Sequence, residues 1–193
     1  MRRILIVGST GSIGTQALDV VERNHDLEVV GLAAASSWEL LLEQAKQHGV
    51  NRVALADPDA AARASEHSSG QVLAGAEGLV ELITDTDCDL VLNALVGSAG
   101  LGPTVAALGE GIDLALANKE SLVVGGELVT TLAEATGAQL IPVDSEHSAL
   151  HQLIAGEAPG TVDRLVLTAS GGPFRGRSDL DSVTREEALA HPT

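Results

Sequence analysis

The chain has 193 residues, of which 45% are hydrophobic and 20% charged, a composition typical of a folded globular protein rather than a disordered one. Eleven basic and 27 acidic side chains give a formal net charge of −16, which repels nucleic acid at long range. The single cysteine excludes an intramolecular disulfide, no apolar run reaches the roughly 18 residues that cross a bilayer, and no apolar leader precedes the first predicted strand. We therefore expect a soluble, acidic, cytoplasmic protein with no nucleic-acid or membrane partner.

Apolar, β-branched runs alternate with helical patterns along most of the chain, which predicts an α/β fold with a parallel sheet flanked by helices. The near-continuous apolar character of these runs fits strands that are buried on both faces. The predicted strands comprise residues 4–7, 29–33, 52–56, 90–93, 113–117, 140–143 and 165–168. The predicted helices comprise residues 12–23, 37–48, 59–67, 78–83, 104–108, 120–136 and 184–191.

Three of the helix starts carry capping signals. Ser36 with Glu39, and Thr184 with Glu187, have the spacing of a capping box, in which each side chain accepts a hydrogen bond from the other residue's backbone N–H. Pro58 stands where a first-turn proline is tolerated. These signals predict where the second, third and last helices begin.

The regular alternation of strands and helices ends near residue 143, where turns rich in glycine and proline take over. We therefore predict one domain over residues 1–143 and the beginning of a second domain over residues 144–193. The sequence stops just after a helix-breaking proline, Pro192, and about 50 residues are few for a domain that folds alone. These features predict that the sequence is the N-terminal part of a longer polypeptide.

Three glycines in a G-x-x-G-x-x-G spacing, Gly8, Gly11 and Gly14, lie between the first predicted strand and the first predicted helix. Such a loop lets backbone N–H groups and a helix N-terminus approach a pyrophosphate, as in dinucleotide-binding sites, and the alternative is an ordinary strand–helix turn. NAD sites usually place a carboxylate at the end of the second strand. Here residues 34–37 read Ala-Ala-Ser-Ser, which favours NADP, although no Arg or Lys stands beside them.

Polar residues follow two later strands, at the edge where open α/β sheets bind ligands. Asn118, Lys119 and Glu120 could order a cofactor ring, contact a substrate oxygen and exchange protons, or simply cap a helix. Asp144 and Glu146 stand two residues apart, so in an extended chain their carboxylates point the same way and suit a hard cation such as Mg²⁺ or Mn²⁺. Two ligands do not complete a metal site, and Asp144 as a helix N-cap is an equally good interpretation.

Two further groups of residues have a chemical and a plain structural interpretation. Ser170, the glycines after it and Arg175 resemble the parts of an anion cradle, or an ordinary turn. His147 and His151 are four residues apart and could hold zinc. The glutamate that metalloproteases place directly after the first histidine is missing, so a histidine pair on a surface helix is favoured.

Four motifs, GSTGSIG, NKESLV, PVDSEH and LTASGGPFR, stand at residues 8–14, 118–123, 142–147 and 167–175. Their order and spacing resemble the 1-deoxy-D-xylulose 5-phosphate reductoisomerase family over essentially the whole chain. The resemblance implies a Rossmann-like parallel sheet flanked by helices, followed by the start of an α+β catalytic domain. It also implies NADPH- and metal-dependent conversion of 1-deoxy-D-xylulose 5-phosphate to 2-C-methyl-D-erythritol 4-phosphate in non-mevalonate isoprenoid biosynthesis, by a homodimer.

The resemblance also implies roles for the residues that match these motifs. Asp144 and Glu146 would ligate Mg²⁺ or Mn²⁺, with a third carboxylate from a stretch that this sequence does not contain. Contacts with the phosphorylated, sugar-like substrate are implied for Lys119, Ser145, Ser170 and His191. Contacts with NADPH are implied for Thr10, Gly11, Ser12, Ile13, Ser37, Asn118 and Glu120.

Two other functions stay open on sequence grounds, an NAD(P)-dependent dehydrogenase without rearrangement and a non-catalytic nucleotide-binding module. The paired carboxylates argue against the dehydrogenase, because plain hydride transfer needs no metal of this kind. We expect the chain by itself to bind the cofactor without turning over substrate, since its metal and phosphate sites are incomplete.

Overall fold

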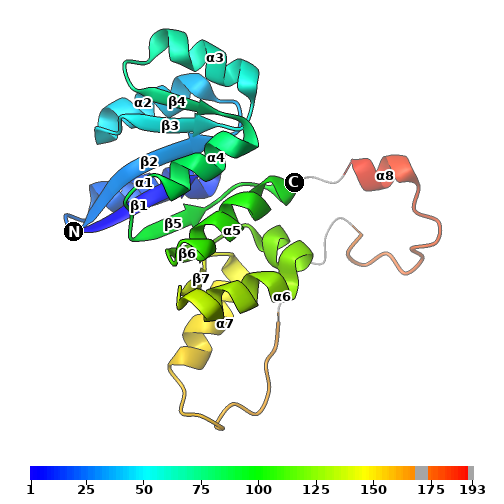
Figure 1. The fold of residues 1–193 in the computed structure, drawn as a ribbon. Coiled ribbons are helices and arrows are strands. Elements are labelled where there is room, and N and C mark those ends of the chain that lie inside the picture. Colours follow the sequence, from blue (N-terminus) through cyan, green and yellow to red (C-terminus); the bar gives the residue numbers. More distant parts are fainter. Residues whose placement is uncertain (168–173, 191–193) are drawn as a thin grey trace. The chain divides into compact units, whose positions relative to one another are not determined.

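A seven-stranded parallel sheet forms the centre of the fold (Figure 1). The computed structural model describes residues 1–167 and 174–190. The strand order β4-β3-β2-β1-β5-β6-β7 reverses between β1 and β5, and such a switch point is where open α/β sheets bind ligands. The strands are β1 (Arg2–Val7), β2 (Leu27–Ala34), β3 (Arg52–Leu55), β4 (Gln71–Ala74), β5 (Leu90–Asn93), β6 (Asp113–Leu116) and β7 (Leu140–Pro142).

Helices cover both faces of the sheet, and two groups of buried side chains mark the two layers. The helices are α1 (Ser12–Glu22), α2 (Trp38–His48), α3 (Pro58–His67), α4 (Gly75–Thr84), α5 (Leu101–Gly109), α6 (Lys119–Thr136), α7 (Ser145–Ala155) and α8 (Arg185–Leu189), with a 3₁₀ turn, η1 (Gly97–Gly100), before α5. Successive side chains of a strand point to opposite faces. Leu5 of β1 therefore joins the core under α4, α5 and α6, whereas Ile6 joins the core under α1, α2 and α3.

Six of the seven predicted strands are confirmed to within two residues of their predicted bounds. The prediction missed β4, a four-residue edge strand in which only Leu73 is buried. The predicted strand at 165–168 is wrong where the structure describes it. Residues 165–167 form no regular element, and the side chains of Leu165, Val166 and Leu167 are 54%, 69% and 64% exposed. These residues pair with no strand in the described part of the chain, and β propensity without a partner strand does not hold a strand.

Two of the three predicted helix starts are confirmed. Thr184 and Glu187 form the full capping box at α8, and Pro58 occupies the first turn of α3 after Asp57, whose carboxylate caps that helix. The capping box predicted at Ser36 is wrong. Because α2 begins at Trp38, its N-cap is Ser37, which makes no side-chain capping hydrogen bond.

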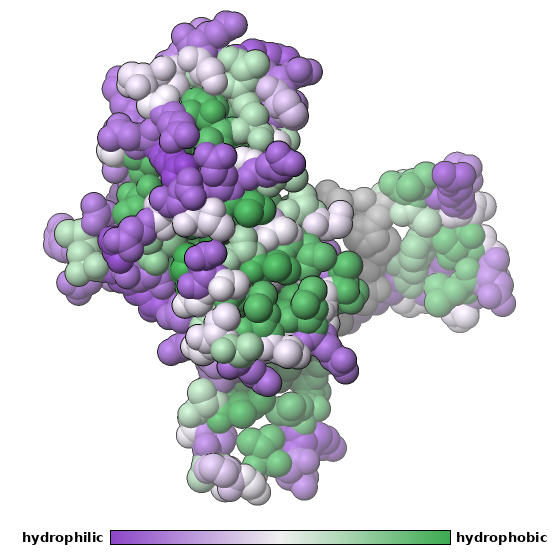
Figure 2. All heavy atoms as spheres, viewed as in Figure 1, coloured by the Kyte–Doolittle hydropathy of each residue, from purple (hydrophilic) through white to green (hydrophobic). Residues whose placement is uncertain are grey.

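Helix α6 is kinked at Gly126, where φ is +35° and ψ is −113°, a conformation that residues with a side chain rarely adopt. Beyond the kink the helix buries Val129 and Ala133 against the sheet. Figure 2 shows hydrophobic side chains gathered over α5 and α6, and on α6 the exposed ones are Val123, Val124 and Leu128. The kink therefore separates residues 119–125, which follow β6, from the part of α6 that buries Val129 and Ala133.

The chain divides into two compact units, Met1–Ser148 and Ala149–Thr193. The first unit holds the whole sheet, α1 to α6 and the start of α7. None of the described residues of the second unit is buried. Over the described residues, no helix is long and apolar enough to cross a membrane.

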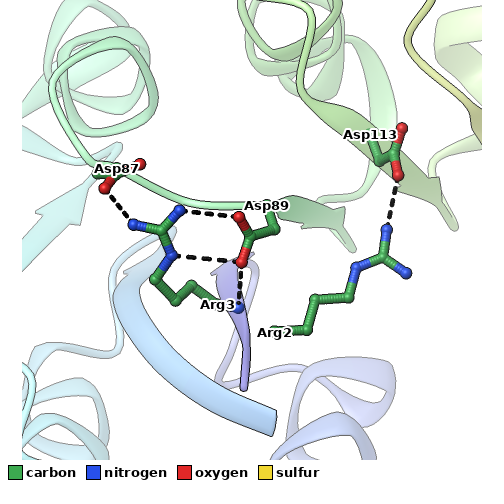
Figure 3. Close-up of polar contacts among 5 residues, drawn as sticks. All are labelled: Arg2, Arg3, Asp87, Asp89 and Asp113. Carbon is green, nitrogen blue, oxygen red and sulfur yellow. Dashed lines mark hydrogen bonds and ion pairs between the residues drawn. The ribbon is translucent and has the colours of Figure 1, made fainter. Parts of the chain in front are cut away.

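A group of ion pairs fastens the amino-terminal ends of the central strands (Figure 3). Arg3 of β1 pairs with Asp87 and makes a two-pronged contact with Asp89, in which Nη2 lies 2.8 Å from Oδ1 and Nε lies 3.2 Å from Oδ2. Arg2 donates to Asp113 of β6 at 2.6 Å, and the second oxygen of Asp113 accepts from the backbone N–H of Gln139 at 2.9 Å. Opposite charges on β1, on the segment before β5 and on β6 thus pair at one edge of the sheet.

We predict that the Arg3–Asp89 pair makes stability depend on acid pH. The hydrogen bonds from Arg3 lower the pKa of Asp89 from 3.8 to about 2, so the folded state binds this proton less readily than the unfolded state does. The resulting stabilisation is fully present above about pH 4 and is lost as the pH falls through about 2. Urea unfolding from neutral pH down to about pH 3 should show a lower free energy of unfolding for Asp89→Asn at neutral pH and a flatter pH dependence. The exposed Asp163→Asn is the control. An unchanged pH dependence in Asp89→Asn would contradict the prediction.

Candidate functional site

The candidate site lies at the carboxyl edge of the sheet, beside the switch point between β1 and β5. Parallel strands deliver their following loops to the same edge. The glycine loop follows β1, residues 94–100 follow β5, residues 117–120 follow β6, and residues 143–146 follow β7. All of them belong to the unit Met1–Ser148.

Two glycines of the loop are required by the fold itself. Gly8 has φ +92°, and a Cβ there would lie 2.7 Å from the carbonyl of Ala94. A Cβ on Gly14 would lie 2.2 Å from the carbonyl oxygen of Gly8, because the first turn of α1 packs directly on the loop. The backbone N–H groups of Gly8 and Ser9 both donate to the carbonyl of Ala33, at 2.8 and 2.9 Å, which fixes the loop to the end of β2.

Gly11 is different, because nothing inside the protein requires a glycine there. Its φ is −80°, and the nearest atom to an added Cβ is 3.4 Å away. It is exposed and forms the N-cap of α1, yet it brings no side-chain oxygen to the first-turn N–H groups, and that turn contains no acidic residue. A helix N-terminus left open in this way accommodates an anion. Of the neighbouring predicted contacts, Ser12 and Ile13 are exposed and Thr10 is half-buried.

A buried contact that the sequence analysis missed braces this loop. The hydroxyl of Ser9, which is fully buried, donates to Oε1 of Gln44 at 2.8 Å, and Nε2 of Gln44 donates to the carbonyl of Ser9 at 3.1 Å. Gln44 stands three residues after the buried Leu41 on α2. A polar residue on the apolar face of a helix is the sequence signal that could have revealed the contact.

The end of β2 presents small side chains to solvent. Ala35, Ser36 and Ser37 are exposed, and the carboxylate of Asp57 beside them is engaged by the N–H groups of Asp59 and Ala60 at 2.9 and 3.4 Å. Residues 35–37 therefore present small side chains and two hydroxyl groups and carry no carboxylate of their own. The nearby carboxylate of Asp57 is already hydrogen-bonded. Ser37 stays a prediction as a cofactor contact.

The three polar residues after β6 do not all face the same way. The side chain of Asn118 is buried and faces the protein interior, where it accepts from the backbone N–H of Ser121 at 3.0 Å. Its amide group donates to the carbonyls of Leu95 and Gly97 at 2.8 and 2.9 Å. Lys119 is exposed and Glu120 is half-buried. The structure thus leaves the latter two to meet a ligand and ties the side chain of Asn118 to the loop after β5.

Lys119 reaches across to the end of β7, where its Nζ lies 2.7 Å from Oδ2 of Asp144. The side chain of Asp144 is only 12% exposed, whereas that of Lys119 is 55% exposed. The hydrogen bond from Lys119 is the main cause that lowers the pKa of Asp144, and the same contact raises the pKa of Lys119. The ammonium group of Lys119 is therefore already paired with the carboxylate of Asp144.

The extended geometry predicted for residues 144–146 is wrong, because α7 begins at Ser145. Asp144 directly precedes α7, and its carbonyl accepts from the backbone N–H of Ser148 at 2.8 Å, so Asp144 occupies the N-cap position of that helix. Glu146 lies in the first turn of α7, where the hydroxyl of Ser145 donates to its Oε2 at 2.7 Å and is the main cause that lowers its pKa.

The donor set at this point fits a hard divalent cation only in part. Two carboxylates are the ligands that Mg²⁺ and Mn²⁺ prefer, and the ammonium of Lys119 stands in for a cation on Asp144. Within the described ranges, no group of three or more His, Cys, Asp and Glu side chains is placed to hold a metal ion. Ser170 and His191, two of the predicted substrate contacts, lie outside the described residues and stay predictions, as does Ser145.

A parallel sheet with a glycine loop and an open helix N-terminus at its switch point is the architecture of the Rossmann type, in which this edge of the sheet commonly binds a dinucleotide. Residues 4–126 match the model of the family described as 1-deoxy-D-xylulose 5-phosphate reductoisomerase, and residues 140–193 match the model of that family's C-terminal domain. The chain belongs to the 1-deoxy-D-xylulose 5-phosphate reductoisomerase family.

Named relatives agree with this membership. The 1-deoxy-D-xylulose 5-phosphate reductoisomerase of Rhodococcus jostii is 58% identical over 99% of this chain and 48% of the relative. The Zymomonas mobilis enzyme, solved in complex with NADPH, has a TM-score of 0.82 and 40% identity over 92% of this chain and 48% of that one. A reductoisomerase solved with NADPH, fosmidomycin and magnesium has a TM-score of 0.80 and 33% identity over 100% of this chain and 51% of that one. The chain spans about half the length of the relatives it matches.

We predict that an added methyl group destabilises the protein at one glycine of the loop and has little effect at another. Gly14→Ala should lower the free energy of unfolding by roughly 2 kcal/mol or more, since its Cβ overlaps backbone that cannot move aside. Gly11→Ala should change it by no more than about 0.5 kcal/mol, because only an ordinary contact is made. Urea unfolding followed by the fluorescence of Trp38, the single tryptophan, measures both. Equal destabilisation by the two variants would show that Gly11 is also a structural glycine.

Proposed function

We propose that the chain supplies the cofactor-binding part and the first metal and substrate ligands of a 1-deoxy-D-xylulose 5-phosphate reductoisomerase. The observation that carries the proposal is the meeting of the open N-terminus of α1, Lys119 and the largely buried side chain of Asp144 at one edge of one sheet. Family membership and the complexes of the relatives with NADPH and magnesium support it. Residues 1–143 would hold the cofactor, and residues 144–193 would begin the catalytic domain.

In this proposal the first turn of α1 binds the pyrophosphate of NADPH through Thr10, Gly11, Ser12 and Ile13. The exposed hydroxyl of Ser37 and the missing carboxylate at the end of β2 leave room for the 2′-phosphate. Glu120, half-buried beside β6, orders the nicotinamide half together with the backbone at Asn118. The cofactor supplies the hydride that reduces the rearranged substrate.

Asp144 and Glu146 would hold Mg²⁺ or Mn²⁺, which polarises the oxygens of the substrate. Lys119 lies within hydrogen-bond distance of Asp144, so a substrate oxygen brought to the cation also meets an ammonium donor. Ser145, Ser170 and His191 complete the proposed substrate contacts, Ser170 at the phosphate. We propose a cytoplasmic homodimer as the setting of this chemistry, as composition and the family resemblance respectively imply.

We predict that NADPH binds at the open N-terminus of α1. Titration of the chain with NADPH, followed by nicotinamide fluorescence, should give an affinity at least about tenfold weaker for Gly11→Ala, since a methyl group enters the space that the phosphates need. NADH should bind more weakly than NADPH. Gly109→Ala, which adds a methyl group in open space at the end of α5, is the matched control. Equal NADPH affinity in Gly11→Ala and the parent chain would show that the pyrophosphate does not bind at this loop.

We also predict that Mn²⁺ binding depends on Asp144. In an electron paramagnetic resonance titration, Asp144→Asn should weaken Mn²⁺ binding at least about tenfold, since a neutral amide replaces an anionic ligand, and Glu146→Gln should weaken it as well. Lys119→Met should strengthen binding, because it removes the cation that now occupies Asp144. The exposed Asp163→Asn should have no effect. Retained Mn²⁺ affinity in Asp144→Asn would favour the plain dehydrogenase or the non-catalytic module.

A further inference from the structure

Four polar side chains are buried together behind the carboxyl edge of the sheet. Asn93 at the end of β5 and Thr104 of α5 are fully buried, and Asn118 and Ser121 at the start of α6 are 1% exposed. Burying a polar group is unfavourable unless it is hydrogen-bonded. Each of these four side chains bonds to at least one of the others.

The amide groups of the two asparagines hold the loop after β5 by its backbone. Nδ2 of Asn93 donates to the carbonyl of Gly100 at 2.8 Å, and its Oδ1 accepts from the N–H of Leu95 at 3.3 Å. Nδ2 of Asn118 donates to the carbonyls of Leu95 and Gly97. A Cβ on Gly100 would lie 2.4 Å from Cγ of Asn118, so the loop closes directly onto this amide. Residues 94–100 are thus fastened at three carbonyls and one N–H.

Two hydroxyl groups connect one asparagine to the other. Asn93 Nδ2 donates to Oγ1 of Thr104 at 2.9 Å, and that hydroxyl donates to Oγ of Ser121 at 3.2 Å. The hydroxyl of Ser121 in turn donates to Oδ1 of Asn118. Each of the two hydroxyl groups donates to one acceptor, so the hydrogen bonds run in one direction from Asn93 to Asn118. The path therefore connects the side chain of Asn118 to β5 through α5, in addition to its own contacts with Leu95 and Gly97.

The same residues set the turn that carries Lys119. The backbone N–H groups of Ala117 and Asn118 both donate to the carbonyl of Asn93, at 3.0 and 3.2 Å. The side chain of Asn118 then caps α6 through the N–H of Ser121. Asn93 consequently fixes two adjacent parts of the edge, the loop 94–100 through its side chain and the turn 117–119 through its carbonyl.

We infer that Asn93 and Thr104 are positioning residues for the nicotinamide ring of the bound cofactor. This inference rests on the function proposed above. In a doubly wound sheet the two halves each take one mononucleotide, and the ribose of the adenosine half is read at the end of the second strand. Asn93, Thr104 and Asn118 all lie on the other half, beyond the switch point. They hold residues 94–100 and 117–120 in one geometry without themselves being exposed.

Stability alone does not explain this network. Replacing a buried hydrogen-bonded set by apolar side chains of the same shape is often neutral or stabilising, whereas a fully satisfied network fixes one arrangement of the segments that it joins. The network joins residues 94–100 to residues 117–120, and both loops lie at the carboxyl edge of the sheet. Of the strand residues in the sheet, only Asn93 takes part.

The test uses two probes and two variants of Thr104. NADPH carries both halves of the cofactor, and 2′-phospho-ADP-ribose lacks only the nicotinamide ring. Thr104→Val removes the hydroxyl and should weaken NADPH binding about tenfold, the effect of about one lost hydrogen bond. It should leave 2′-phospho-ADP-ribose binding unchanged within about twofold. Thr104→Ser restores the hydroxyl and should bind NADPH as the parent chain does.

The binding measurements on Thr104→Val distinguish a positioning role from a merely structural one. Unchanged NADPH affinity in Thr104→Val would overturn the inference, and so would equal weakening for both probes, which a merely structural role predicts. Absence of NADPH binding to the parent chain would instead overturn the proposed function.

The parent chain provides a second measurement that needs no variant. NADPH should slow backbone hydrogen exchange at residues 94–100 and 117–121 more than 2′-phospho-ADP-ribose does, and equal slowing would contradict the inference.

Discussion

The parallel direction of the seven strands is the constraint on which the rest of the structure depends. It sends every loop that follows a strand to one edge, so that segments more than one hundred residues apart, such as the glycine loop and Asp144, reach the same side of the sheet. Because β1 lies between β2 and β5, the strand order reverses near the middle of this edge, and such a switch point is where ligands bind. At the opposite edge, Arg2 and Arg3 pair with aspartates on the segment before β5 and at the start of β6. The two edges thus have different roles. One carries ion pairs that hold strands together, and the other carries the open N-terminus of α1 and the exposed ammonium group of Lys119.

The negative net charge of the chain makes these local cationic and N–H groups at the carboxyl edge necessary. The chain carries a formal charge of −16, yet the proposed ligands, a dinucleotide phosphate and a phosphorylated substrate, are anions themselves. Long-range attraction is therefore absent, and local groups have to favour the anion. The N-terminus of α1 offers N–H groups with no acidic residue in its first turn, and Lys119 places an ammonium at the neighbouring strand end. Because Asp144 is largely buried, the same ammonium also compensates a carboxylate that would otherwise be costly to keep ionised.

Sequence reasoning was accurate where a local pattern alone decides the structure. Continuous apolar runs identified six strands, and the glycine spacing identified the loop that Gly8 and Gly14 shape by close backbone approach. It was wrong where a distant partner decides. The short strand β4 exists because β3 lies beside it, and residues 165–167 form no strand because no described strand pairs with them. At Asp144 the start of α7 overrode the extended geometry that spacing suggested.

The candidate site shows the same limit at the level of single side chains. The motif NKES identified Asn118 and Lys119 together, but it cannot show that one points inward and the other outward, since that depends on which carbonyls lie behind Asn118. Asn93, Thr104 and Gln44 belong to no motif, and their importance follows from burial combined with polarity. Such residues are visible only once the fold has brought β5, α5 and α6 together. A ligand edge built on exposed loops depends on buried groups of this kind, because flexible loops bind precisely only when their backbone is fastened from within.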